Sequence, residues 1–306
     1  MLYPPEGRLL HRPENQAACA SLAALKQALE QETVLEGRVI LCSPTRDLTV
    51  TAGPFTGVIP RDEAALGIRE GTARETSILS RVGKPAAFTV KALRTGQGAP
   101  SLILSRRRAQ ELALNQLMAC PPGTVLPATV THLEPFGAFV DVGCGIPSMV
   151  GIENCSVSRI SHPSCRFLVG QHIFVVLTGT DKNLNRVYLS HKELLGTWSE
   201  NAARFSPGMT LPGIVRSVKE YGSFIELAPN FTGLADRTED LAENDLVSVY
   251  IRAIQPQRMK VKLTVIEKLE PAAVPTPLPY FITGGRLEHW EYAPPDCPNK
   301  QGSRDF

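Results

Sequence analysis

Two stretches of the chain place aromatic side chains where they could stack on flat ring systems. The first, LEPFGAFVDVG, spans residues 133–143, and the second, KEYGSFIELAPN, spans residues 219–230. Successive side chains of a β-strand point to opposite faces, so Phe139 faces away from Ala138 and Val140. A phenylalanine on the polar face of a strand, close to a glycine, leaves room for a nucleobase to lie flat against its ring.

The aromatic spacing occurs twice, which indicates an internal repeat. In each copy a valine, Val130 or Val215, stands nine positions before the second aromatic, which in the later copy is Phe224. A first aromatic, Phe136 or Tyr221, stands three positions before the second. The first aromatics could bind bases or belong to a hydrophobic core, and both interpretations stay open.

Each copy continues with a strand rich in valine and isoleucine, a polar turn and a short alternating strand, as in HIFVVLTGTDKNLNRVYLS and LVSVYIRAIQPQRMKVKLT. A fainter copy precedes them, with its anchor at Val39 and its last strand ending at Ser105. Units of about 65–75 residues built from short strands and turns are typical of small barrels. The sequence therefore predicts a mostly β protein with three barrels in tandem.

The first repeat differs from the other two because it lacks the aromatics. Nine positions after Val39 stands Leu48, and the first-aromatic position falls on Thr45. A register shifted by one residue would put Thr49 in the outward position instead. In either register we expect this repeat not to stack bases, although its basic residues could still contact phosphate.

Helices are expected to connect the barrels. Residues 14–32 are rich in Ala, Leu, Glu and Gln, residues 105–118 have helical apolar spacing, and residues 191–205 repeat that role. The stretch EPAAVPTPLP predicts an extended linker. After it, YFITGGRLEHWEYAPP predicts a short hairpin that turns at Gly284-Gly285.

These patterns divide the chain into seven parts. The expected parts are an N-terminal helical segment (1–33), a degenerate barrel (34–105), a helical linker (106–122), a second barrel (123–192), a helical linker (193–206), a third barrel (207–268), and a Pro-rich linker with a C-terminal hairpin (269–306).

Composition limits the class of protein. Of the 306 residues, 43% are hydrophobic and 20% are charged, with a net charge of +2, as is ordinary for a soluble globular protein. The seven cysteines include no CxxC pair, which favours reduced thiols in a cytoplasm. No run approaches the roughly 20 apolar residues that span a bilayer, so we expect no membrane association.

The runs PFGAFVDVG, FLVGQHIFVVLTGTD and RVYLSHKELLGTW of the second repeat closely resemble the S-one (S1) domain of ribosomal proteins. That domain is an RNA-binding barrel of the oligonucleotide-binding (OB-fold) type. The third repeat, with PGMTLPGIVRSVKEYGSFIEL, is similar, and the first matches in outline only. The resemblance covers roughly residues 34–268 and implies three tandem five-stranded OB barrels, as in the short multi-domain S-one-like proteins of bacteria.

In this family RNA lies on the barrel face that carries the aromatics. The resemblance implies RNA contacts in the second repeat by Phe136, Phe139, Asp181 and Arg186, and in the third by Tyr221, Phe224 and Lys260. The third repeat departs from the pattern at Gln255, where the family has the aspartate. The family histidine after the third strand is replaced by Gly151 in the second repeat and by Asp236 in the third.

Other basic residues are candidates for phosphate contacts. The segment SVSRISHPSCRF carries Arg159, His162 and Arg166, and Lys219 belongs to a basic group on the strands of the third repeat. The segment could equally be a solvated loop, or one clamped to the barrel by Arg166 and Phe167. The run Arg106–Arg108 is expected to be a solvated helix face, with an RNA backbone contact as the alternative.

The sequence shows no catalytic or metal-binding pattern. Cys144, Cys155, His162 and Cys165 contain only one His-x-x-Cys and no close cysteine pair, so we expect no metal and no cofactor. We expect a monomeric, non-catalytic protein that binds single-stranded RNA or mRNA and acts in translation or mRNA binding at the small ribosomal subunit; whether it is stably bound to that subunit stays open. The alternatives are an accessory factor of RNA processing or decay, and a protein-interaction scaffold built of barrels.

Overall fold

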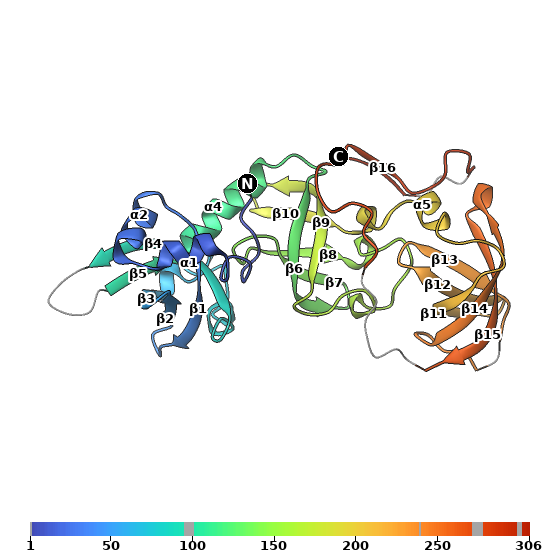
Figure 1. The fold of residues 1–306 in the computed structure, drawn as a ribbon, viewed down its shortest axis with the longest axis horizontal. Helices are drawn as coiled ribbons and strands as arrows, with labels where there is room; N and C mark the ends of the chain where they lie inside the picture. Colours follow the sequence, from blue (N-terminus) through green and yellow to red (C-terminus); the bar gives the residue numbers. More distant parts are fainter. Residues whose placement is uncertain (1, 95–100, 239, 271–277, 299–301) are drawn as a thin grey trace.

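Three closed β-barrels follow one another in the chain and lie in a row along the long axis of the molecule (Figure 1). The computed structural model describes residues 2–94, 101–238, 240–270, 278–298 and 302–306. In each barrel the first strand pairs with the second and the fourth, and the fifth closes the barrel against the third. The predicted mostly β fold with three tandem five-stranded barrels is confirmed.

The three barrels use equivalent strands. The first barrel contains β1 (Leu35–Cys42), β2 (Leu48–Ala52), β3 (Phe55–Ile59), β4 (Pro85–Arg94) and β5 (Ser101–Ser105). The second contains β6 (Val125–Glu134), β7 (Gly137–Asp141), β8 (Pro147–Gly151), β9 (His172–Asp181) and β10 (Arg186–Ser190). The third contains β11 (Thr210–Lys219), β12 (Gly222–Ala228), β13 (Phe231–Ala235), β14 (Leu246–Gln255) and β15 (Lys260–Leu269).

The anchor valines that define the repeat are core residues. Val39, Val130 and Val215 are all buried, each in the interior of its own barrel. The strand register shifts directly after each of them, as at a β-bulge. Such a shift changes which residue lies opposite the next strand, so counting along the sequence does not give the pairing by itself.

Helix α4 (Arg106–Ala119) connects the first two barrels, as predicted. The Ser105 side chain caps its N-terminus by accepting from the backbone N–H of Arg108, and Ala109 and Ala113 pack into the core of the second barrel. Between the second and third barrels lie η4 (Lys192–Leu195) and α5 (Trp198–Ala202). The remaining short helices are η1 (Arg61–Glu63), α3 (Thr76–Leu79), η2 (Ile152–Asn154), η3 (Pro163–Cys165) and η5 (Pro256–Arg258).

The N-terminal region contains two helices where the composition predicted one. They are α1 (Pro13–Cys19) and α2 (Leu22–Glu30). The helix is interrupted between them because Ser21 adopts an extended conformation. Its side chain accepts from the backbone N–H of Ala24, as an N-cap does.

The predicted hairpin at Gly284-Gly285 is wrong. The carbonyl of Gly285 accepts from the backbone N–H of Val125, so this stretch lies beside the start of β6. The strand pair of the C-terminal region is instead β16 (His289–Glu291) with β17 (Ser303–Asp305). Gly285 makes a contact with a residue far away in the sequence, Val125, and a local turn pattern cannot predict such a contact. Most of the predicted Pro-rich linker, residues 271–277, falls outside the described residues.

The N-terminal segment joins the first barrel to the second. Glu6 pairs with Arg106 at 2.6 Å and with Arg81 at 2.8 Å, and its backbone N–H donates to Asp141. Burial alone would raise the pKa of Glu6, but Arg106 and Arg81 hold it below its ordinary value. The expected solvated face of the Arg106–Arg108 run is therefore wrong for Arg106, which is buried.

The C-terminal segment packs back over the second barrel and its junction with the third (Figure 1). Tyr280 anchors it: the Tyr280 hydroxyl lies 2.9 Å from Nε2 of His191 and accepts from the backbone N–H of Phe174. The other His191 nitrogen, Nδ1, lies 2.7 Å from the carbonyl of Cys155. Because a carbonyl only accepts, Nδ1 carries the hydrogen and Nε2 of the neutral ring accepts from Tyr280.

This buried contact predicts a pH dependence of stability. Burial lowers the pKa of His191 from 6.5 to about 4. The unfolded chain therefore binds this proton more readily, and His191 stabilises the fold fully only above pH 6.5. Between about pH 6.5 and 4 we expect protonation of His191 to lower the free energy of unfolding by up to roughly 3 kcal/mol.

Urea unfolding at pH 7 and pH 4.5 measures this effect. From pH 7 to pH 4.5, His191→Gln should lose up to roughly 3 kcal/mol less stability than the unmodified chain, whereas His11→Gln, at an exposed position, should follow the unmodified chain. Equal pH dependence in the two variants would contradict the assignment.

Among the described residues, no helix is long and apolar enough to cross a membrane.

Candidate nucleic-acid interface

A row of rings and one thioether crosses the outer face of the second barrel. His132 of β6 lies opposite Phe139 of β7, Phe139 opposite Met149 of β8, and Met149 opposite Tyr188 of β10. The ring of Phe136 meets that of Phe139 edge-on, with centroids 6.0 Å apart. These five side chains, Phe136, Phe139, His132, Met149 and Tyr188, are called the aromatic row.

The aromatic row is open to solvent. Phe136 is 55% exposed and Tyr188 is 49% exposed, while Phe139 is half-buried. Phe136 is therefore not a core residue. Sequence reasoning missed Tyr188, His132 and Met149. Alternation in RVYLS, with Val187 and Leu189 buried, already places Tyr188 on the outer face and could have found it.

The third barrel repeats the pair of rings. Tyr221 is 68% exposed, and its ring meets that of Phe224 edge-on with centroids 6.2 Å apart. Across the strands Phe224 lies opposite Ser217 and Leu234, and Leu234 lies opposite Lys262. This face therefore has two rings and a cation where the second barrel has its aromatic row.

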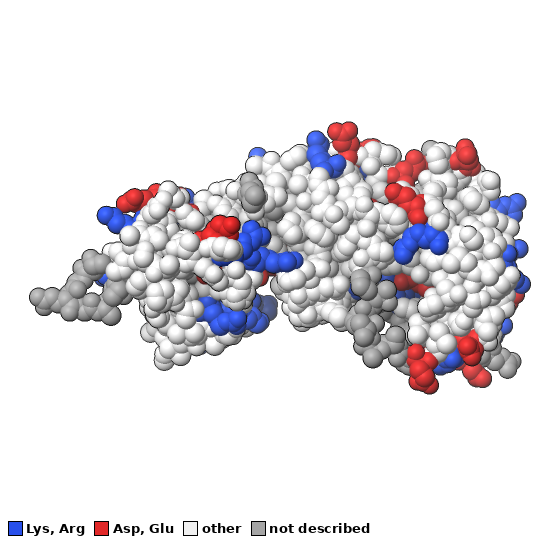
Figure 2. Space-filling view, viewed as in Figure 1, with Lys and Arg blue, Asp and Glu red and all other residues white. Residues whose placement is uncertain are grey.

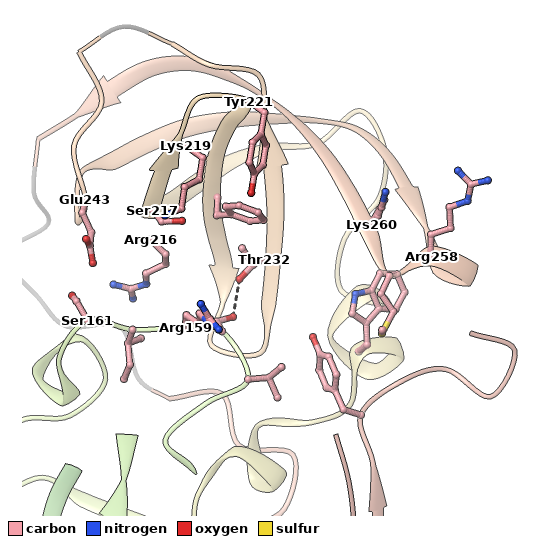
Figure 3. Close-up of a pocket in the computed structure, with 17 residues that line it drawn as sticks. Arg159, Ser161, Arg216, Ser217, Lys219, Tyr221, Thr232, Glu243, Arg258 and Lys260 are labelled. Carbon is pink, nitrogen blue, oxygen red and sulfur yellow. Dashed lines mark hydrogen bonds between the residues drawn. The ribbon is translucent and has the colours of Figure 1, made fainter. Parts of the chain in front are cut away.

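A groove of about 720 Å³ runs beside these rings, and we call it the junction groove. It brings together five of the predicted site residues, namely Arg159, Lys219, Tyr221, Phe224 and Lys260. Figure 3 shows Lys219 on a strand of the third barrel, Tyr221 in the turn that follows it, and Arg159 on the loop that comes from the second. A neighbouring hollow of about 510 Å³ shares Phe224 and Lys260 with it. Arg258, which belongs to the same basic group of the third repeat as Lys219, also lines the junction groove next to Lys260.

Arg166 does not have the expected phosphate-contacting role. Its side chain is only 3% exposed and makes two hydrogen bonds of 2.8 Å to the carboxylate of Glu226 on β12. Arg216 pairs with the same carboxylate at 3.1 Å. Burial would raise the pKa of Glu226, but the two guanidinium groups hold it below its ordinary value. Arg166 therefore clamps its loop to the next barrel.

The remaining predicted residues of the second repeat lie at its turns. Asp181 accepts from the backbone N–H groups of Asn183 and Leu184 and so shapes the turn before β10. Arg186 is exposed at the start of β10, across the strand pair from Asp181. His162 accepts from the backbone N–H of Ser164 at the start of η3. Of these three, only Arg186 presents an exposed cation beside the aromatic row.

The first barrel presents no ring at the equivalent position. After its register shift, Thr49 lies opposite Leu41, as Phe139 lies opposite His132. Leu48 is fully buried, so the register that placed Leu48 outward is wrong and the shifted register is correct. Thr49 continues a row of aliphatic side chains, with Val58 and Ile103 next to it.

Charge is distributed in small groups. Figure 2 shows lysine, arginine and acidic residues scattered over an otherwise uncharged face, with no continuous basic surface on that side. The net charge of +2 agrees with this picture. A polyanion would therefore meet local cations such as those of the junction groove, and the protein as a whole would attract it only weakly.

Comparison with protein-family models matches residues 120–192 to the S1 RNA binding domain. The matched residues include all five strands of the second barrel. The second barrel is therefore similar to the S1 RNA binding domain. The chain is 33% identical over 181 residues to the small ribosomal subunit protein bS1 of Leuconostoc lactis, covering 54% of this chain and 42% of that protein.

Two further relatives carry similar names. The bS1 homolog of Bacillus subtilis is 31% identical over 163 residues, covering 49% of this chain and 42% of the relative. The bS1 of Neisseria meningitidis is 28% identical over 232 residues, covering 74% of this chain and 40% of the relative. The chain thus spans about two fifths of the length of these curated relatives.

Proposed function

We propose that the chain is a non-catalytic protein that binds single-stranded RNA through its second and third barrels. The observation that carries this proposal is the pair of outward rings that recurs in the same edge-on geometry, Phe136 with Phe139 and Tyr221 with Phe224. Unpaired bases stack on exposed rings largely irrespective of sequence, and nearby cations contact the phosphates.

Each barrel alone offers few cations, so its affinity is expected to be modest and sensitive to salt. Two barrels on one chain raise the effective concentration of the second site once the first has bound. Binding therefore gains strength mainly from the tandem arrangement and from stacking, with phosphate contacts as a smaller contribution.

The relatives are named as proteins of the small ribosomal subunit. We therefore propose that this chain acts on mRNA in translation, as a cytoplasmic monomer associated with that subunit.

The surface of the first barrel favours a second role for that part of the chain. Its outer face carries exposed Leu41 beside Thr49 and Val58, which suits a protein contact better than base stacking.

Fluorescence anisotropy with a labelled, unstructured RNA tests the proposal. We expect binding at micromolar protein in low salt, with an affinity that falls as salt rises. A duplex of the same length should bind more weakly, because its bases are stacked on one another and do not reach the rings. Absence of salt-dependent binding to the single strand would refute the proposed function.

A further inference from the structure

The loop that lines the junction groove belongs to the second repeat, although the strands of the groove belong to the third. Residues 157–161 form one wall, and the opposite side includes residues from β11, β12, β13 and β15 (Figure 3). The groove is therefore complete only when the two barrels are held together.

Several buried or partly buried contacts hold this loop in place. The backbone N–H of Val157 donates to Asn230 at 2.9 Å, and the Ser158 hydroxyl lies 2.7 Å from that of Thr232. At the far end of the loop, Arg166 pairs with Glu226. Arg159 lies between these fixed points, so its position over the third barrel is determined by the junction.

The groove has the charge of a site for a polyanion. Arg159, Lys219, Arg258 and Lys260 are exposed and line it. Within the part of the chain that the structure describes, none of these four cations is paired with a carboxylate. The acidic residue in the lining is Glu243. The remaining cation, Arg216, is paired with Glu226.

The groove also has the size and the surfaces for a nucleotide. Its volume of about 720 Å³ falls within the range of roughly 300–1,000 Å³ that is usual for small-molecule sites. The rings of Tyr221 and Phe224 offer base-stacking surfaces, and the exposed cations surround them.

We propose that the second and third repeats form one composite RNA site, in which Arg159 of the second repeat contacts the phosphates of a strand stacked on the third barrel. This inference rests on the proposed function and extends it. The two repeats then act as a single binding unit at their junction, and the buried Arg166–Glu226 pair serves to place Arg159.

The test measures how the affinity for a labelled unstructured RNA changes with salt in the full chain. Each phosphate contact on a single strand contributes about 0.7 to the slope of log K against log salt. Arg159→Ala should reduce the slope by about this amount, as should Lys260→Ala within the third barrel. Lys26→Ala, which removes an exposed cation from α2, should leave the slope unchanged.

The outcomes separate the inference from the proposed function. If Lys260→Ala reduces the slope and Arg159→Ala does not, the composite site is wrong while RNA binding by the third barrel stands. If the unmodified chain does not bind RNA, the proposed function fails and the inference fails with it. Thermal unfolding of each variant confirms that it is folded, which we expect because all three side chains are exposed.

Discussion

Replacing Phe139 with alanine should weaken binding of single-stranded RNA by about 1–3 kcal/mol, with little change in the salt slope. The ring lies at the centre of the aromatic row, between His132 and Met149. Removing it takes away a stacking surface and leaves every cation in place. Phe224→Ala should act in the same way on the third barrel. Fluorescence anisotropy over a range of salt concentrations measures both quantities.

The first barrel supplies the matched control. Thr49 occupies the position equivalent to Phe139, so Thr49→Ala should leave the affinity nearly unchanged. Leu48→Ala is unsuitable as a control because Leu48 is fully buried, and its truncation is expected to cost roughly 2–5 kcal/mol of stability. Equal losses of affinity in folded Thr49→Ala and Phe139→Ala would show that RNA binds elsewhere.

Replacing Glu226 with alanine should destabilise the protein by roughly 3–5 kcal/mol. The carboxylate pairs with both Arg166 and Arg216, whose side chains are nearly inaccessible to solvent. Without it, two guanidinium groups remain buried with no counter-charge. Urea unfolding at constant pH measures the loss.

An exposed acid nearby gives the comparison for this variant. Glu220 stands six positions earlier in the turn before β12 and is exposed, so Glu220→Ala should change stability by less than about 0.5 kcal/mol. A loss of similar size in the two variants would mean that the buried pairs do not hold the second and third barrels together.

The sequence was sufficient to predict the repeat, the barrels and the outward aromatics, because each depends on local alternation. Phe139 and Phe224 face outward because their neighbours Val140 and Ile225 face a core. The same reasoning failed at Leu48, where a shift of one residue after the anchor valine exchanges the two faces of the strand.

The contacts between barrels could not be predicted in this way. Arg166 and Glu226 are 60 positions apart, and nothing in the local pattern of either residue indicates the other. Asp141 occupies the same place in the second barrel as Glu226 in the third. It accepts from the backbone N–H of Glu6, from the segment that precedes the first barrel. Both acids lie on the outer face of their strand, and both are covered by an earlier part of the chain.

Burial beneath the N-terminal segment changes the pKa of Asp141. Burial, together with the nearby charge of Glu6, raises its pKa to about 7. An outward acid in an alternating strand is ordinarily expected to be solvated, so the sequence alone gives no reason to expect this shift. The junctions between the barrels thus depend on long-range contacts, while the proposed RNA-binding faces follow from the strand pattern.

Ultraviolet crosslinking of the full chain to an unstructured RNA, followed by mapping of the modified peptides, tests RNA binding by the second and third barrels most directly. We predict adducts in the peptides that carry Phe136 and Phe139, and in those that carry Tyr221 and Phe224. Adducts confined to the first barrel, or to peptides without these rings, would contradict the proposal.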